Sequence, residues 1–204
     1  DMSYDWPGHN RLNQVAQGKM NATDLADHLV AVQKNYNPKH AVMSFTSNHD
    51  ENSWNGTVEE RMGDASELMA VLTYAMPGVP LIYSGQEYEL DKRLKFFEKD
   101  FIPKTESSFM LLYKTLNKLK KSTSALDVGV NPATISLLSH DNENVLAFSR
   151  TKGDDTLFFI GNCSATPQTV RLEIEGTYSD VFQDSQLSLS EVTLAPWEYI
   201  LATN

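Results

Sequence analysis

Three polar residues follow a short apolar segment in the first third of the chain, where residues 45–50 read Phe-Thr-Ser-Asn-His-Asp. The carboxylate of Asp50 can accept hydrogen bonds and stabilise developing positive charge, and the imidazole of His49 can donate a hydrogen bond. Groups placed at the C-terminal end of a strand are held rigidly and face a cleft. We therefore predict a ligand site here, with Asn48 bracing the strand end beside His49 and Asp50.

A second apolar run ends in the same way about thirty residues later. Residues 76–87 read Met-Pro-Gly-Val-Pro-Leu-Ile-Tyr-Ser-Gly-Gln-Glu, so a strand is followed by a glycine, an amide and a carboxylate. Two such strand ends separated by a helical segment are typical of consecutive parallel β/α units. Both tips would then lie at one edge of the sheet, and Gln86 and Glu87 would either contact the ligand or orient that edge.

Each residue also has a simpler interpretation. Asp50 can cap the segment that follows its strand, and His49 can be a packing histidine. Four aromatic residues in expected loops near the site offer flat faces for stacking but can equally pack locally: Tyr4, Trp6, Trp54 and Tyr88. Lys92 and Arg93 are expected to be a solvated charge group with Glu89 and Asp91. The spacing of His40, His49 and Glu51 matches no common metal-ligand pattern, so we predict no metal and no cofactor.

The elements that position these groups are readable from the periodicity. A capping sequence at residues 21–24 precedes an amphipathic helix of about twelve residues carrying Leu25, Leu29, Val32 and Tyr36. A buried strand is predicted over 41–45, a helix over 59–74, a strand over 79–83 and a helix over 107–121. Seven short β-prone runs follow, separated by turn residues: 135–138, 145–150, 156–161, 169–174, 178–182, 192–194 and 199–201. The sequence thus predicts an α/β part over residues 1–124 and an antiparallel β-sandwich over residues 125–204.

Composition narrows the class of ligand and partner. The chain has 204 residues, of which 41% are hydrophobic, so it can bury a core. Its net charge of −10 argues against nucleic acid, because phosphate backbones need clustered Lys and Arg. A neutral or polar ligand fits better. No apolar run approaches the roughly 20 residues needed to span a bilayer. The single cysteine, Cys163, is expected to be a small buried side chain.

Taken together, these motifs resemble the alpha-amylase superfamily, glycoside hydrolase family 13. In that family the seventh strand of a (β/α)8 barrel ends in Asn-His-Asp, as residues 48–50 do here, and the eighth commonly runs from Pro-Gly to Gly-Gln-Glu, as residues 77–87 do. Residues 4–6, Tyr-Asp-Trp, are similar to an element of the sixth strand, and residues 195–197 are similar to the Pro that precedes the last strand of the family's terminal β-domain. Residues 90–100 are similar to an extended loop after the eighth strand in a bacterial subgroup.

The resemblance implies a fold and a set of roles. The chain would be strands six to eight of a TIM barrel followed by the β-sandwich domain. Its parent would be a retaining, alpha-glucan-acting glycoside hydrolase of the alpha-amylase type. Asp50 would be the transition-state stabiliser, and the substrate contacts would be His49, Asn48, Gln86, Glu87, Trp54 and Tyr4. The family's nucleophilic Asp and acid/base Glu, on its fourth and fifth strands, have no counterpart here, so we expect the chain to be inactive alone.

Several expectations follow from that interpretation. An incomplete barrel leaves open strand edges and an apolar face, which predicts pairing with the remaining barrel half or self-association. Calcium is frequent in the family, but its usual ligands lie upstream, so none is assigned. A secreted or periplasmic location is favoured over a cytoplasmic one. Two alternatives stay open: a non-catalytic carbohydrate- or partner-binding relative of the same fold, and glycan binding by the β-domain alone.

Overall fold

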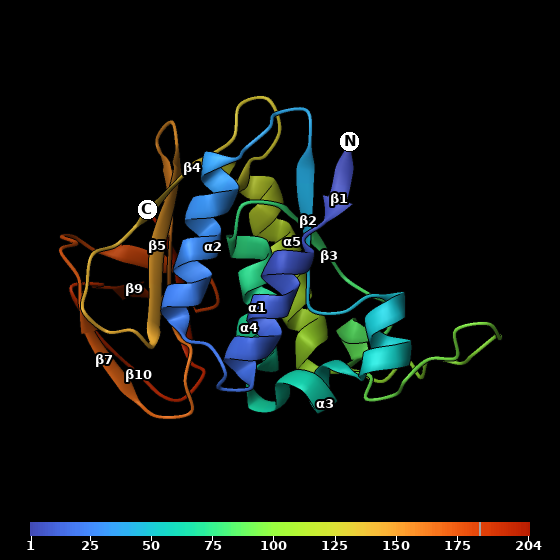
Figure 1. The fold of residues 1–204 in the computed structure, drawn as a ribbon. Coiled ribbons are helices and arrows are strands. Elements are labelled where there is room, and N and C mark those ends of the chain that lie inside the picture. The colour runs from blue at the N-terminus through green and yellow to red at the C-terminus, as the bar shows by residue number, and fades with distance from the viewer. Residues whose placement is uncertain (184) are drawn as a thin grey trace.

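The computed structural model describes residues 1–183 and 185–204 of the chain. Three parallel strands lie side by side in the order β1 (Met2–Tyr4), β2 (Ala41–Phe45) and β3 (Val79–Leu81). The connections between them and the segment after them carry the helices α1 (Trp6–Ala16), α2 (Ala22–Lys34), α3 (Val58–Met62), α4 (Ser66–Ala75) and α5 (Ser108–Ser122) (Figure 1). This arrangement confirms the predicted series of β/α units. Across the described residues, every helix is too short or too polar to traverse a lipid bilayer.

The observed helix boundaries can be compared with the capping and glycine signals in the sequence. Asn21 caps α2 and forms a capping box with Asp24, as the sequence predicted. The helix ends at Lys34, so Tyr36 lies beyond it. The single helix predicted over residues 59–74 is wrong in one respect: it is divided into α3 and α4 at Gly63, whose φ of +48° ends α3. A residue with positive φ cannot continue a right-handed helix, and glycine adopts that conformation without steric cost.

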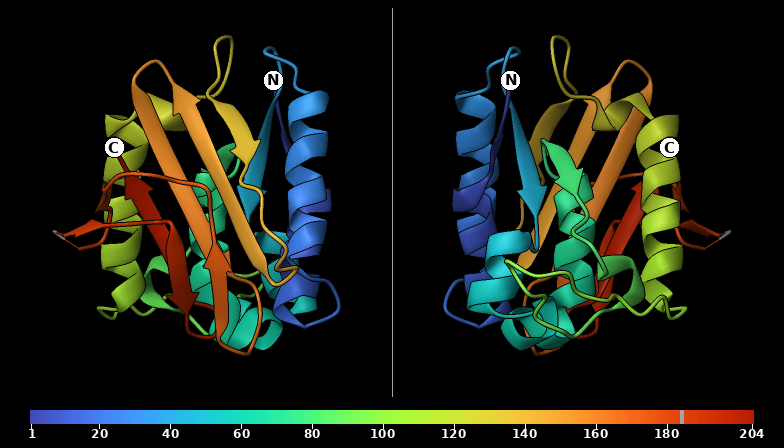
Figure 2. Two further views of the ribbon diagram at one scale, coloured as in Figure 1. Left: turned by 90° about the vertical axis from the view of Figure 1, so that its left-hand side faces the viewer. Right: turned by 90° about the vertical axis from the view of Figure 1, so that its right-hand side faces the viewer.

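The three-stranded sheet has one covered face and one open face. The in-register pairing places Tyr4, Met43 and Val79 next to one another on the same face. All three are only partly buried, whereas Ser44, on the opposite face toward the helices, is buried. The right panel of Figure 2 shows β2 and β3 from the side that the helices leave uncovered. In a β/α barrel the helices lie outside, so this open face corresponds to the barrel interior.

The rest of the chain forms two antiparallel sheets. The larger has the strand order β4 (Thr134–Leu137), β5 (Val145–Lys152), β6 (Asp155–Asn162), β11 (Tyr199–Thr203), β8 (Tyr178–Asp180) and β9 (Gln186–Leu187) (Figure 2, left). The smaller pairs β10 (Glu191–Leu194) with β7 (Gln168–Arg171). All seven predicted β-prone runs contain a strand. Among the antiparallel strands of the described residues, β9 is the one that the sequence did not reveal, because its two residues are too few to display an alternating pattern.

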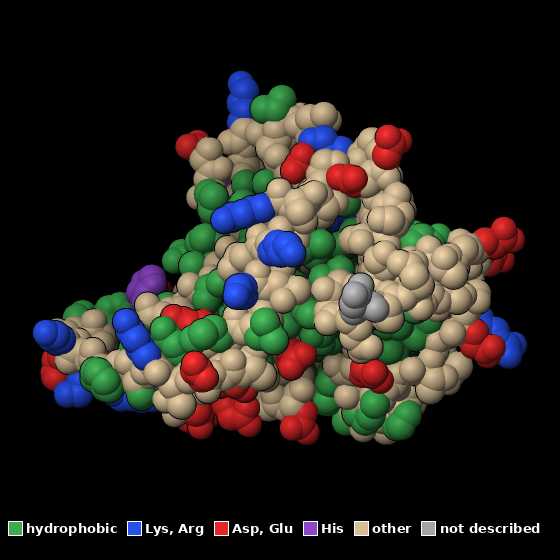
Figure 3. Space-filling model, turned by 180° about the vertical axis from the view of Figure 1, so that it is seen from behind, with side chains coloured by type: hydrophobic (Ala, Val, Ile, Leu, Met, Phe, Trp, Pro, Cys, Tyr) green, Lys and Arg blue, Asp and Glu red, His purple; other side chains and the backbone are tan. Residues whose placement is uncertain are grey.

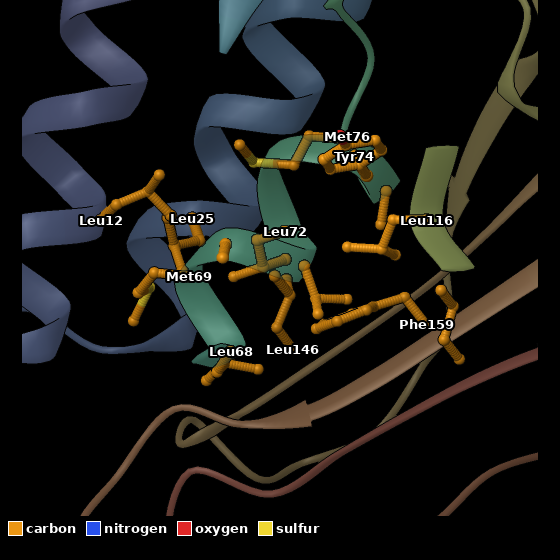
Figure 4. Close-up of a cluster of buried hydrophobic side chains, with 14 of the residues drawn as sticks. Leu12, Leu25, Leu68, Met69, Leu72, Tyr74, Met76, Leu116, Leu146 and Phe159 are labelled. Atoms are coloured by element: carbon orange, nitrogen blue, oxygen red, sulfur yellow. The ribbon is translucent and has the colours of Figure 1, made fainter. Parts of the chain in front are cut away.

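The two faces of the larger sheet have different partners. Along β5, Val145 and Ala147 face the smaller sheet and pack with Val170, while Leu146 and Phe148 face the helices. Figure 4 shows Leu146 and Phe159 of this sheet meeting Leu72 and Leu116 of the helices. One hydrophobic cluster therefore joins the helical part to the β-sheet part. The last α-helix, α5, ends at Ser122, and the first antiparallel strand, β4, begins at Thr134. Cys163 is buried, and burial raises the pKa of its thiol to about 12.

Candidate functional site at the ends of the parallel strands

The polar residues that follow β2 are of two kinds: Thr46, Ser47 and Asn48 support the end of the strand from inside the fold, and Asp50 is accessible. Thr46, Ser47 and Asn48 are buried, and the Asn48 Oδ1 accepts the backbone N–H of Glu51 at 2.8 Å. Asp50 lies just before a short π-helical turn, η1 (Glu51–Asn55), and its side chain makes no capping hydrogen bond there. The capping function considered for Asp50 is thus carried out by Asn48. The Asp50 side chain keeps 48% of its accessible surface.

His49 lies beside this carboxylate. Its Nε2 is 3.7 Å from Oδ2 of Asp50, and its side chain is 53% exposed, so it is not a buried packing histidine. The imidazole ring also lies 5.7 Å from the ring of Phe96, in the segment that follows β3. His49 therefore connects Asp50 to a second group of side chains, and short π-helical turns of the kind that follows it are frequent at functional sites.

The tip after β3 is fastened to the tip after β2. Gly85 has a φ of +94° and opens a short turn, η3 (Gln86–Tyr88). Gln86 Nε2 donates to Oγ1 of Thr46 at 2.6 Å, while its Oε1 accepts the N–H of Tyr83 at 2.6 Å. Glu87 accepts the N–H of Gly85 at 3.1 Å. The two strand ends thus meet at one edge, as the sequence predicted, and both polar side chains of the second tip have partners within the fold.

The aromatic residues fall into two groups. Tyr4 and Trp6, expected in loops, instead lie in β1 and α1, and the Tyr4 ring packs 5.2 Å from Phe45 and 5.7 Å from Trp6. The expectation of loops was wrong here because the strand and the helix follow each other with a single residue between them. Trp54 belongs to η1 and is 58% exposed. It lies beside Phe96, in the same group as His49.

A buried polar cluster beneath Asp50 was not found from the sequence. His9 Nδ1 hydrogen-bonds to the carbonyl of Phe45 at 3.1 Å, and its Nε2 lies 3.0 Å from Oε2 of Glu51. Arg61 Nη2 donates to the carbonyl of Thr46 at 2.8 Å, and its Nη1 donates to Asn13 at 2.6 Å. The cluster therefore fixes the end of β2 from below. In the sequence, the i, i+4 spacing of His9 and Asn13 could have indicated that the two side chains share one helix face. That spacing does not show that Glu51 and Arg61 are their partners.

Burial and charge set the protonation behaviour of this cluster. Burial lowers the pKa of His9, against the opposing effect of the Glu51 carboxylate. Burial alone would raise the pKa of Glu51, but its hydrogen bonds to His9 and Asn55 outweigh burial and lower it. An open hollow of about 650 Å³ lies over the cluster, lined by Trp6, His9, Asn10, Asn13, Gln14, Gln17, Lys19, Glu51, Asn55 and Arg61. Among residues 1–183 and 185–204, no three His, Cys, Asp or Glu side chains are grouped to hold a metal ion.

Comparison with known proteins gives consistent results. Residues 135–201 match the family model of the maltogenic amylase C-terminal domain. The chain is 28% identical, over 178 residues, to Alpha-amylase MalA of Haloarcula japonica, covering 84% of this chain and 25% of that protein. It is similar in fold to a noncanonic maltogenic alpha-amylase AmyB from Thermotoga neapolitana, with a TM-score of 0.83, 20% identity, and coverage of 100% of this chain and 50% of that one.

Two further solved structures agree. An alpha-amylase from Lactobacillus plantarum gives a TM-score of 0.76 at 19% identity, and the alpha-amylase GTA from Geobacillus thermoleovorans, solved in complex with acarbose, gives 0.76 at 16% identity. Each of the two matches covers all of this chain and 48% of the solved chain. The chain thus spans a quarter of the curated relative and about half of these solved structures. The chain is therefore a relative of the alpha-amylases of glycoside hydrolase family 13: part of a parallel β/α fold followed by a maltogenic-amylase C-terminal domain.

Proposed function

We propose that this chain supplies part of the active site of a retaining glycoside hydrolase that cleaves α-glucosidic bonds, with Asp50 as the residue that stabilises the transition state. The observation that carries the proposal is the position of Asp50: a half-exposed carboxylate with no capping role, at the carboxyl end of a parallel strand. Such a carboxylate can accept hydrogen bonds from sugar hydroxyls, and those bonds strengthen as positive charge develops on the ring.

The neighbouring groups suit a substrate-binding function. His49 is exposed beside Asp50 and can donate a hydrogen bond to the same sugar. Gln86 and Glu87 have partners in the turn, so in this proposal they hold the edge of the site in shape and contact substrate secondarily. Tyr4 packs on Phe45 and offers at most one face. Two proteins of similar fold were solved with such ligands, GTA with acarbose and AmyP with maltose or, as a variant, with maltotriose, which supports an alpha-glucan as the ligand class.

The nucleophile and the acid are not among the carboxylates next to Asp50. Retaining hydrolysis requires two carboxyl groups about 5 Å apart across the scissile bond. Glu51 is buried against His9, and Glu87 accepts the N–H of Gly85 within its own turn, so this proposal assigns neither of them to attack or protonate a glycosidic bond. In this proposal both groups come from strands that would complete the barrel next to the open face of β1, β2 and β3. The isolated 204-residue polypeptide is then expected to hydrolyse no starch or maltooligosaccharide above background.

The test compares two carboxylate variants in the protein expressed from its complete reading frame. Asp50→Asn is expected to lower kcat on maltooligosaccharides by about 100- to 1,000-fold, as loss of one transition-state contact does. Asp64→Asn, at an exposed position in the turn between α3 and α4, is the matched control and should retain full activity. Equal kcat for Asp50→Asn and the unchanged protein would reject the proposal. Binding of maltooligosaccharides without any turnover would instead identify a non-catalytic carbohydrate-binding relative.

The open face of the sheet predicts a partner for the polypeptide when it is produced alone. Tyr4, Met43 and Val79 are only partly buried on that face, and β1 and β3 are the edge strands. Apolar surface and unpaired edges favour association. Light scattering on the isolated polypeptide should therefore show self-association, and a monodisperse monomer would contradict this expectation.

A further inference from the structure

Three large aromatic side chains near Asp50 are exposed to solvent. Trp54 is 58% exposed, Phe96 38% and Phe97 85%, although large apolar side chains are normally buried. The Phe96 ring lies 5.4 Å from that of Trp54 and 4.7 Å from that of Phe97. We call these three residues the aromatic cluster. Through His49, which contacts Phe96 on one side and approaches Asp50 on the other, the cluster is continuous with the candidate site.

The fold holds this cluster in place from below. The side chain of Asn52 donates to the carbonyl of Lys92 at 3.1 Å and accepts the N–H of Leu94 at 2.7 Å. Ser53 Oγ donates to the carbonyl of Leu94 at 2.7 Å. Both residues belong to η1, the turn that follows Asp50 and contains Trp54. The segment carrying Phe96 and Phe97 is thus fastened to the turn that Asp50 begins.

Ion pairs stiffen the same segment. Lys92 Nζ lies 2.5 Å from Asp100, whose pKa is lowered to about 2, mainly by this hydrogen bond. Arg93 donates from Nε and Nη2 to the two carboxylate oxygens of Glu60, at 2.8 and 3.1 Å. The expected group of Lys92 and Arg93 with Glu89 and Asp91 is therefore wrong, because residues distant in sequence lie nearer. We call residues 90–106 the arm; it projects from the body of the fold (Figure 1).

The surface of the arm suits a neutral ligand with flat apolar faces. Figure 3 shows hydrophobic side chains interspersed with charged ones along the projection at the left of that view. Lys92, Arg93 and Lys95 each form an ion pair with a carboxylate of the protein, so their charges are already neutralised and do not favour an anionic ligand. Pyranose rings combine apolar C–H faces with hydroxyl groups at the ring edge, and exposed aromatic rings are suited to their faces. Three rings are also far too little surface for a stable protein interface, which buries about 1,600 Å² in total.

We propose that Trp54, Phe96 and Phe97 form a binding surface for the sugar rings of an α-glucan chain that continues outward from Asp50. This proposal rests on the proposed function and adds a determinant of chain length to it. A short oligosaccharide fills the positions next to Asp50 and His49 only. A longer one also reaches the aromatic cluster and gains affinity from stacking there.

The experiment measures, by isothermal titration calorimetry, the affinity for maltotriose and for maltoheptaose of the protein expressed from its complete reading frame and carrying Asp50→Asn, which slows hydrolysis of the ligand during the titration; the variants below are made in that background. Phe97→Ala is expected to weaken maltoheptaose binding about tenfold, equivalent to about 1.4 kcal/mol, and to leave maltotriose binding within about twofold. Trp54→Ala should act in the same direction, and the fluorescence of Trp54 should change with maltoheptaose. Phe101→Ala is the matched control, because Phe101 is 74% exposed on the same arm but lies outside the aromatic cluster.

The outcomes separate this proposal from the proposed function. Equal effects of Phe97→Ala and Phe101→Ala, or an equal loss for both oligosaccharides, would overturn the aromatic surface. If Asp50→Asn lowers kcat as expected while Phe97→Ala changes neither affinity, the aromatic surface is rejected and the proposed function stands. If the unchanged protein neither binds nor hydrolyses these oligosaccharides, the proposed function itself fails. Unchanged melting temperatures for the Phe97 and Phe101 variants exclude misfolding as the cause.

Discussion

Nε2 of His9 lies 3.0 Å from Oε2 of Glu51, and both side chains are nearly buried. This contact joins helix α1, which follows the first strand, to the residue directly after Asp50. Arg61 supports the same point from a third element, with Nη1 4.0 Å from Glu51. The position of the Asp50 carboxylate is therefore determined by residues from α1, η1 and α3, as well as by the strand that precedes it.

The buried histidine predicts a pH dependence of stability. Because the pKa of His9 is lowered from its ordinary 6.5, the unfolded chain binds more protons than the folded chain just below pH 6.5, so acidification destabilises the fold. Glu51 acts in the same direction at lower pH, since its pKa lies below 4.5 and its contribution is lost as the pH falls through the folded value. We expect the melting temperature of His9→Gln to fall less than that of the unchanged protein between about pH 7.5 and pH 5.5.

The control for this prediction is His40→Gln, at an exposed histidine. His140, whose pKa is also lowered by burial, contributes equally to the unchanged protein and to both variants. An equal fall of melting temperature in the His9 variant and in the unchanged protein would show that the His9 ring does not titrate as the fold predicts.

We predict that hydrogen bonds of Arg150 contribute strongly to the stability of the contact between the helical part and the larger sheet. It is fully buried, and its Nη1 lies 3.3 Å from the carbonyl of Ala75 and 3.1 Å from that of Met76, at the C-terminal end of α4. Its Nη2 donates to the carbonyl of Asp127 at 3.0 Å. Arg150→Met leaves these carbonyls without their donor, so we expect the free energy of unfolding in urea to fall by about 3 kcal/mol. Arg171→Met, at an exposed arginine paired with Glu191, should change it by less than about 1 kcal/mol. Similar losses in the two variants would rule out the special position of Arg150.

Gln86 is predicted to act mainly through structure. Its side chain joins the ends of β2 and β3 by hydrogen bonds to Thr46 and Tyr83. Gln86→Ala should therefore lower the free energy of unfolding by about 1–2 kcal/mol, and its effect on maltooligosaccharide affinity should follow that loss of stability. Glu87→Gln keeps an acceptor for the Gly85 N–H and serves as the control. A Gln86→Ala variant of unchanged stability that binds sugar poorly would instead identify Gln86 as a direct ligand of the substrate.

The shared hydrophobic cluster predicts cooperative unfolding of the two parts. Leu72 of α4 and Leu146 of β5 lie in one cluster, and both are almost completely buried. Leu72→Ala removes buried methyl groups and leaves a cavity, at a cost of about 2–5 kcal/mol. Scanning calorimetry should show a single transition moved to lower temperature. Leu111→Ala, at a position that is 67% exposed on α5, should leave the transition within about 0.5 kcal/mol. Two separate transitions, of which Leu72→Ala moves one, would contradict a common core.

The sequence by itself determined most of the elements and their order, although it did not reveal α1, β9 or the division between α3 and α4. Most strands are marked by an apolar run with its own flanking turn residues, and helices α2, α4 and α5 by apolar positions at spacings of three and four, so residues within about ten positions suffice to encode them. The same local information placed Asp50 and Gln86 at the ends of neighbouring strands, because parallel strands put their carboxyl ends at one edge.

Only the tertiary structure decided the partners of the polar side chains. Asn48 rather than Asp50 takes the capping hydrogen bond, His9 meets Glu51 across 42 positions of sequence, and Arg93 pairs with Glu60 rather than with the nearer Asp91. The physical reason is that a hydrogen bond or an ion pair depends on distances of a few ångströms between groups on different elements. Those distances are set by how helices and strands pack, and periodicity along one segment carries no information about them.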